Sequence, residues 1–109
     1  MNFTFNEDDI AFQDAAHRVC AEVLKTNAAR YDETREFCRE SLDALGELGF
    51  WGMNLPEQYG GVEISSIAMS LAVEEIAYHC AATCSSLTAH FLATDSVLIG
   101  ATEDQKQTL

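Results

Sequence analysis

The sequence predicts an all-α fold: a small up-and-down helical bundle of about five helices that occupies residues 1–109 as a single domain. Apolar residues recur along most of the chain with a period near 3.6, which is typical of amphipathic helices. The chain contains one proline and six glycines, so long stretches have no helix breaker. Apolar residues make up 48% of the chain, as in globular proteins that bury a core.

The first helix is predicted over residues 7–29. Asn6 is a favourable N-cap, and Asp9 stands at the third helical position, where its carboxylate can complete a capping box. Residues 31–36 are mostly polar and are expected to form a connector.

A second helix is predicted over residues 38–48, with leucines on one face. Gly49 is placed to stop it in the left-handed conformation, and Phe50 is expected to fold back onto Leu45. The stretch 51–61 combines the proline with three glycines and is expected to be an ordered loop.

The third helix is predicted over residues 67–82, capped by Ser65 or Ser66. Its apolar residues cover nearly the whole circumference, so we expect it to be central and buried on most sides.

A fourth helix is predicted over residues 84–99, ending at Gly100. Thr102 and Gln105 then form the pattern of a capping box that opens a fifth helix. A helix of only two turns is not stable by itself, so the natural protein is expected to continue beyond Leu109.

The charge balance excludes several function classes. The chain has 18 acidic and 6 basic residues, a net charge of −12, and no Lys or Arg between Glu40 and Gln105. Nucleic acids and anionic membranes both require clustered cations, so neither is an expected partner. The phosphates of a nucleotide would need their cations from elsewhere.

No membrane span is expected, because no run approaches the roughly 20 apolar residues that cross a bilayer. No secretory signal is visible at the start of the sequence. The four cysteines lack CxxC spacing, which favours reduced, buried thiols and a cytoplasmic location.

Four short motifs occur in a fixed order along the chain. They are Phe3-Thr4 before an acidic helix start, Leu45-Gly46-Glu47-Leu48-Gly49-Phe50 running into Leu55-Pro56-Glu57-Gln58-Tyr59-Gly60-Gly61, Glu74-Glu75-Ile76-Ala77, and Gly100-Ala101-Thr102-Glu103-Asp104-Gln105-Lys106. Together they resemble the amino-terminal helical domain of the acyl-CoA dehydrogenases over nearly the whole chain. Cys38 departs from this resemblance, because many members of the family have proline there.

The resemblance implies an FAD-dependent oxidoreductase that dehydrogenates an acyl-CoA thioester between its α and β carbons. Members have a middle β-domain and a carboxy-terminal helical domain, both absent here, and these domains with a neighbouring subunit hold FAD. The carboxylate that removes the α-proton usually lies in the carboxy-terminal domain, so no catalytic residue is expected in this chain. Alone, it is expected to be inactive and not to retain FAD.

The resemblance also implies partners: the acyl-CoA substrate, the two missing domains, further copies in a homo-oligomer, and an electron-transfer flavoprotein or similar acceptor. It places Cys84, Ser85, Thr88 and Ala89 on the wall of the acyl-chain pocket, as substrate-binding residues. Positions spaced this way share one helical face, and their small side chains would leave room for a substrate.

Two rival interpretations come from different function classes. The domain could be a stand-alone helical interaction module without catalytic activity, or a helical binder of a metal or cofactor. Cys80 and Cys84 lie one turn apart and could clamp zinc, but His79 points away from that face, and buried thiols acting as small hydrophobes are favoured.

Other polar groups are better explained by structure than by catalysis. Glu74 and Glu75 point about 100° apart on a helix, so one is expected to face solvent and the other a partner. Ser85-Ser86 with His90 lacks a nucleophile elbow, and His90 is expected at a pocket edge or in the core. The Gly60-Gly61 pair is expected to form a tight structural turn rather than a phosphate loop.

Overall fold

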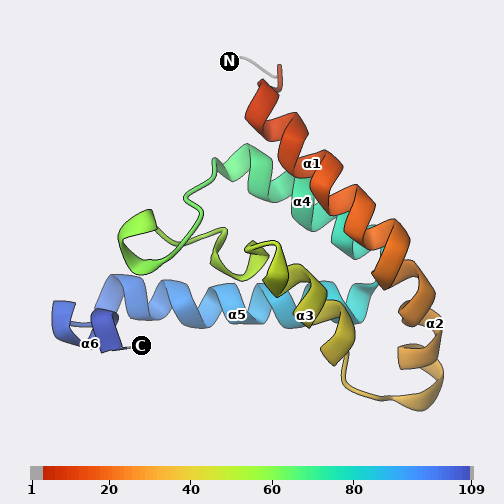
Figure 1. Ribbon diagram of the computed structural model, residues 1–109. Coiled ribbons are helices and arrows are strands. Elements are labelled where there is room, and N and C mark those ends of the chain that lie inside the picture. Colours follow the sequence, from red (N-terminus) through yellow and green to blue (C-terminus); the bar gives the residue numbers. More distant parts are fainter. Residues whose placement is uncertain (1–3, 109) are drawn as a thin grey trace.

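The computed structural model describes residues 4–108, and every regular element in that range is helical (Figure 1), which confirms the predicted all-α class. The first rod is continuous through three segments: α1 (Glu7–Val19), the π-helical η1 (Cys20–Leu24) and α2 (Lys25–Thr34).

The predicted capping box opens α1. The Asp9 backbone N–H donates to Asn6 Oδ1 at 2.8 Å, and the Asn6 N–H donates back to Asp9 Oδ2 at 3.0 Å. Asp9 is buried, and its other oxygen accepts from Ser65 Oγ at 2.8 Å. Ser65 in turn caps α4 (Ser66–His79) by accepting from the Ala68 N–H at 3.0 Å. One carboxylate therefore joins the starts of two helices.

The predicted end of the first helix is wrong. The helix continues to Thr34, because Tyr31 belongs to its buried face, and Arg35 ends it in the left-handed conformation at φ 60°. The connector is thus confined to residues 35–38.

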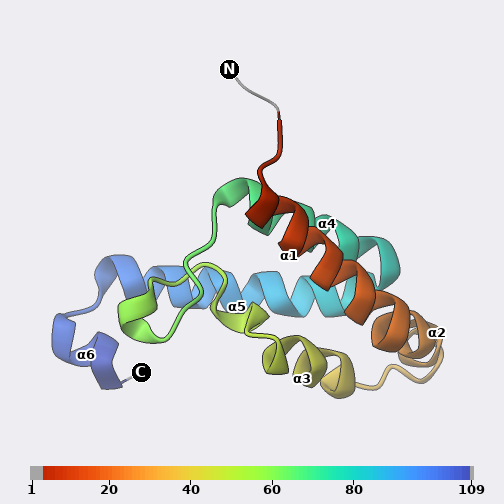
Figure 2. The same cartoon turned by 45° about the horizontal axis from the view of Figure 1, so that its top comes forward.

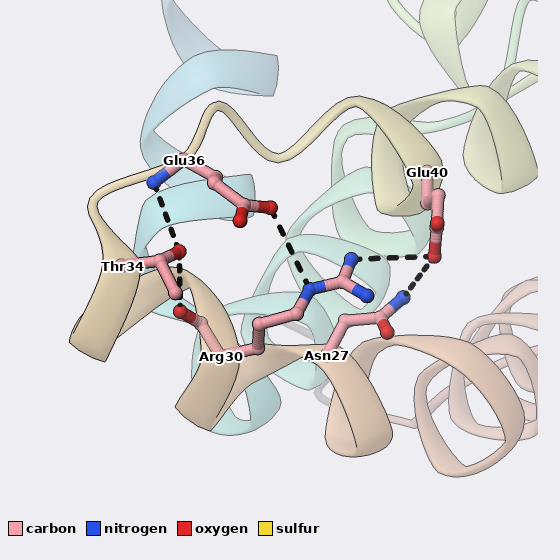
Figure 3. A network of polar contacts seen from close by, with 5 residues as sticks. All are labelled: Asn27, Arg30, Thr34, Glu36 and Glu40. Carbon is pink, nitrogen blue, oxygen red and sulfur yellow. Dashed lines mark hydrogen bonds and ion pairs between the residues drawn. The ribbon is translucent and has the colours of Figure 1, made fainter.

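Polar contacts around Arg30 fasten this connector (Figure 3). The Arg30 guanidinium lies 3.8 Å from the Glu36 carboxylate and 3.4 Å from that of Glu40, which also accepts from Asn27 Nδ2 at 3.2 Å. Thr34 Oγ1 donates to the Arg30 carbonyl at 2.8 Å and accepts from the Glu36 N–H at 3.2 Å. The network ties α2 to the start of the next helix.

That next helix, α3 (Arg39–Glu47), agrees with its prediction to within one residue at each end. Gly49 follows in the left-handed conformation at φ 82°, as expected. Phe50 and Leu45 are both buried in the same core. The loop that follows contains two short 3-10 turns, η2 (Phe50–Gly52) and η3 (Glu57–Tyr59).

The boundary between the next two helices differs from the prediction. Helix α4 ends at His79 and α5 (Ala81–Gly100) begins two residues later, with Cys80 extended between them at φ −156° and ψ 102°. The predicted bounds of 67–82 and 84–99 therefore place the break three residues too late. The chain then enters α6 (Glu103–Thr108), whose capping box between Thr102 and Gln105 is present as predicted.

Helix α4 is central, since α1 lies along it and α5 forms an antiparallel hairpin with it (Figures 1 and 2). Helix α3 and η2 pack against α5 as well. The fully buried core contains Ala16, Cys20, Leu24, Leu45, Phe50, Met53, Ile76 and Leu87. Contrary to the prediction, α4 is not buried on most sides: Ile67 and Tyr78 are 44% and 86% exposed. Within residues 4–108 no helix is long and apolar enough to cross a membrane.

Candidate functional site

The four residues predicted to bind substrate lie together near the start of α5. Ser85 and Ala89 are exposed, and Cys84 and Thr88 are half-buried. Their side of the helix is turned away from Leu87, which is buried in the core. The structure therefore gathers the predicted residues on one open face, which we name the α5 outer face.

Hydrogen bonding reduces the polarity of this face. Thr88 Oγ1 donates within its own helix, to the Cys84 carbonyl at 3.0 Å or the Ser85 carbonyl at 3.1 Å. The Cys84 thiol donates weakly to the Val73 carbonyl of α4, at 3.9 Å. Burial, together with the nearby Cys80 thiol, raises the pKa of Cys84, so this side chain stays neutral at physiological pH. A face of small, uncharged side chains whose Thr88 hydroxyl is already hydrogen-bonded is compatible with an apolar ligand.

The α5 outer face continues beyond the predicted residues. Leu92 and Ile99 are 72% and 85% exposed, and Ser96 lies between them on the same side. Large apolar side chains this open are typical of surfaces that another domain or partner covers. Neither residue was predicted as part of this face, although their spacing from Ser85 and Ala89 repeats that of one helical face.

The other flank of α5 carries a separate hollow of about 360 Å³, lined by Phe37, Arg39, Leu42, Trp51, Ser86, Leu87 and His90. Trp51 Nε1 donates to the Leu42 carbonyl at 2.8 Å, which fixes the indole against α3. His90 Nε2 donates to the Trp51 carbonyl at 2.9 Å and lines this hollow. None of the four predicted wall residues lines this hollow.

The loop before α4 is fastened to α5 through Asn54, a residue that was not predicted from the sequence. Its Nδ2 donates to Thr94 Oγ1 at 2.9 Å and to Asp95 Oδ1 at 2.7 Å. An asparagine between apolar residues carries no recognisable signal, because its partners lie about 40 residues away along the chain. These two hydrogen bonds hold the loop against α5.

The glycine pair in this loop forms a tight structural turn, as predicted. Gly60 adopts φ 83°, which favours glycine. A Cβ atom on Gly61 would lie 2.0 Å from the Leu55 carbonyl oxygen, so the two backbone segments pass too closely for any side chain.

The two adjacent glutamates have different environments. Glu74 is exposed, whereas Glu75 is half-buried and accepts from His17 Nδ1 of α1 at 3.2 Å. This is the division that helical geometry predicts for neighbouring residues. The partner of Glu75 is therefore His17 of this same chain. Because the two carboxylates diverge, Glu74 and Glu75 do not act as an acid/base couple around one reacting atom.

The cysteines are free thiols without a metal cluster. Burial raises the pKa of Cys20 to about 12, with added contributions from Glu75, Cys80 and Cys84, so its nucleophilic thiolate is suppressed. Within residues 4–108, no group of three or more His, Cys, Asp or Glu side chains is placed to hold a metal ion.

Nucleophilic chemistry has no support at Ser85-Ser86 and His90. Ser86 Oγ lies 3.5 Å from the Sγ of Cys38, while His90 is bonded to the Trp51 carbonyl. The serine and the histidine therefore have separate partners.

Comparison with known proteins gives a consistent result. Residues 6–109 match the family model described as acyl-CoA dehydrogenase, N-terminal domain. The chain is 34% identical over 107 residues to a probable medium-chain specific acyl-CoA dehydrogenase 2, mitochondrial, of Caenorhabditis briggsae, covering 98% of this chain and 26% of that protein. It is 32% identical over 109 residues to the probable acyl-CoA dehydrogenase YngJ of Bacillus subtilis, covering 99% of this chain and 29% of that protein.

The fold is also found in a solved structure. A chain reported under "Electron transferring flavoprotein of Acidaminococcus fermentans: Towards a mechanism of flavin-based electron bifurcation" superposes with a TM-score of 0.89 and 33% identity, over 99% of this chain and 29% of that one. This chain therefore spans between 26% and 29% of the length of the proteins it matches here.

Proposed function

Because this chain belongs to the acyl-CoA dehydrogenase family as its amino-terminal domain, we propose that it forms one wall of the acyl-chain pocket in an FAD-dependent acyl-CoA dehydrogenase. The whole enzyme would oxidise an acyl-CoA thioester to its α,β-unsaturated product. The wall consists of Cys84, Ser85, Thr88 and Ala89. The 109 residues alone would be inactive, because this proposal places the catalytic carboxylate in the carboxy-terminal domain.

The α5 outer face is the observation that supports this proposal. Its predicted wall residues are small, uncharged and open on the side away from the core, and large exposed apolar residues continue the face toward Ile99. A fatty chain gains free energy by leaving water for such a surface, at about 25 cal/mol per Å². In this proposal, the middle and carboxy-terminal domains supply the opposite side of the pocket.

Helices α4 and α5 do not fit the diphosphate of FAD. Between Glu40 and Gln105 the chain has ten acidic residues and no Lys or Arg, so helices α4 and α5 offer no cation to a phosphate. The proposal therefore assigns FAD to the other two domains and the neighbouring subunit of a homo-oligomer. This chain contributes only substrate contacts.

The enzyme would also need an electron acceptor. Its electrons would pass to an electron-transfer flavoprotein or a similar acceptor. Its four free thiols support a reducing compartment, and we place the protein in the cytoplasm.

Ala89→Leu in the complete enzyme tests the proposed wall. The added carbon atoms would shorten the pocket, so kcat/KM for the longest accepted acyl-CoA should fall about tenfold or more relative to the shortest. The measurement is the activity against saturated acyl-CoAs of graded length.

Ala11→Leu is the matched control, because Ala11 is an exposed alanine of α1 on a different helix. It should leave the chain-length profile unchanged. An unchanged profile in Ala89→Leu, in an enzyme that retains its FAD, would contradict the proposed wall.

A further inference from the structure

A line of exposed side chains along α5 has the spacing of a helix that pairs with another helix. Its six residues follow each other at alternate steps of three and four: Ala82, Ser85, Ala89, Leu92, Ser96 and Ile99. Two paired helices place residues at this spacing along their line of contact. We name these six residues the α5 seam.

The sizes of the side chains along the seam suit a second, antiparallel copy of α5. With a two-fold axis between Ala89 and Leu92, Ala89 of each copy faces Leu92 of the other. The same register places Ala82 opposite Ile99, and the two serines of the seam opposite one another. Each large apolar side chain therefore meets an alanine, so the two helices can approach closely without a clash of bulky groups.

The hydroxyl groups of the seam can be buried in this contact. Ser96 Oγ donates to the Leu92 carbonyl of its own helix at 2.9 Å, and its oxygen can still accept a hydrogen bond. Ser85 of the second copy stands opposite and has a hydroxyl proton to donate. No polar side chain of the seam therefore loses its hydrogen bonds when water leaves.

The distribution of charge also favours contact through α5. Two copies that each carry a net charge of −12 repel one another. Of the 18 acidic residues in the sequence, only Asp95 lies in α5, and it accepts from Asn54 Nδ2 at 2.7 Å. The seam itself contains no charged residue, so its contact with a second seam brings no two carboxylates of the seam together.

We propose that the 109-residue chain pairs with a second copy of itself through the α5 seam, as an antiparallel dimer with two-fold symmetry. The seam is about 26 Å long, from 17 helical steps of about 1.5 Å each. Leu87 and Phe91 of the same helix remain in the core of their own copy. Pairing therefore requires no rearrangement of the fold.

Pairing and acyl-chain binding exclude one another, because the seam shares Ser85 and Ala89 with the proposed wall. In the complete enzyme, the acyl chain and the other domains would cover these residues. The α5 dimer is therefore distinct from the homo-oligomer proposed for the enzyme. It belongs to the chain without its other domains, where it removes Leu92 and Ile99 from water.

Leu92→Glu in the 109-residue chain tests the pairing. At high protein concentration, light scattering should give the wild type a mass that approaches twice the 12.0 kDa of one chain. The substitution removes both contacts between leucine and alanine and places two carboxylates near the axis. The dissociation constant should therefore rise at least about tenfold. Circular dichroism checks that the change at this exposed position leaves the helices intact.

Leu48→Glu is the matched control. Leu48 is also an exposed leucine, at 50%, but it lines a hollow with residues of α1 and lies outside the seam. This variant carries the same change in charge and should dimerise like the wild type.

Disulfide capture tests the direction of the two helices. Oxidation of a mixture of Ala82→Cys and Ile99→Cys should join the two variants to each other. Neither variant should join to itself, because identical seam ends lie about 25 Å apart along an antiparallel pair. The wild type shows the background from the four native thiols.

A wild-type chain that stays at 12.0 kDa, or a dimer that persists unchanged in Leu92→Glu, would overturn the pairing. Ile99→Cys joined to itself would overturn the antiparallel direction. None of these results would contradict the acyl-chain wall, which is tested in the complete enzyme.

Discussion

Gly60 and Gly61 are neighbours with different structural constraints. Gly60 needs the left-handed conformation but has open space where a side chain would stand. Gly61 has an ordinary backbone conformation but passes so close to Leu55 that a Cβ would lie 2.0 Å from its carbonyl oxygen. Conformation limits the first residue, and space limits the second.

Alanine substitutions separate these two constraints. Gly60→Ala should cost about 1 kcal/mol of unfolding free energy, the usual penalty for a left-handed alanine. Gly61→Ala should cost about 3 kcal/mol, because a backbone segment must move to admit the methyl group. Urea denaturation of both variants measures the difference, and equal losses would refute the close approach at Gly61.

At the scale of elements, Asp9 connects two helix starts. Its carboxylate completes the capping box of α1 and also accepts from Ser65, the N-cap of α4. Because Asp9 is only 3% exposed, these bonds are protected from competing water. The Asp9 carboxylate therefore helps to fix the position of α1 relative to α4.

Asp9→Ala should lower the unfolding free energy by about 2–4 kcal/mol, since it leaves both the Ser65 hydroxyl and the Asn6 N–H without this acceptor. Asp8→Ala is the matched control: Asp8 is an exposed acidic residue of the same first turn, and its loss should cost less than about 1 kcal/mol. Thermal and urea unfolding measure both. Similar losses in the two variants would mean that Asp9 acts only through the helix dipole.

Helix starts could be predicted from the sequence better than helix ends. Asn6, Ser65 and Thr102 cap their helices through neighbours three residues away, so the signal is local. The end at Thr34 could not be found in this way, because Arg35 adopts the left-handed conformation without being glycine. The break at Cys80 likewise lies next to Ala81-Ala82, residues that favour a helix in isolation.

For the whole molecule, the all-α fold and the face shared by the wall residues followed from periodicity and resemblance. Leu92 and Ile99 extend that face and were not predicted, because an apolar helix such as α5 gives little indication of which side meets the core. A pocket that closes only between domains has its other walls in a different part of the polypeptide. The sequence of this chain therefore specifies the proposed wall and not the shape of the pocket.

The most direct test of the acyl-chain wall is photolabelling of the complete enzyme with an acyl-CoA that carries a diazirine at the end of its acyl chain. Cleavage after glutamate would release residues 76–103 as one peptide, since no glutamate lies between Glu75 and Glu103. The account predicts label in this peptide, at residues 84–89, which excess unlabelled acyl-CoA prevents. Protectable label found only in peptides outside 76–103 would contradict it.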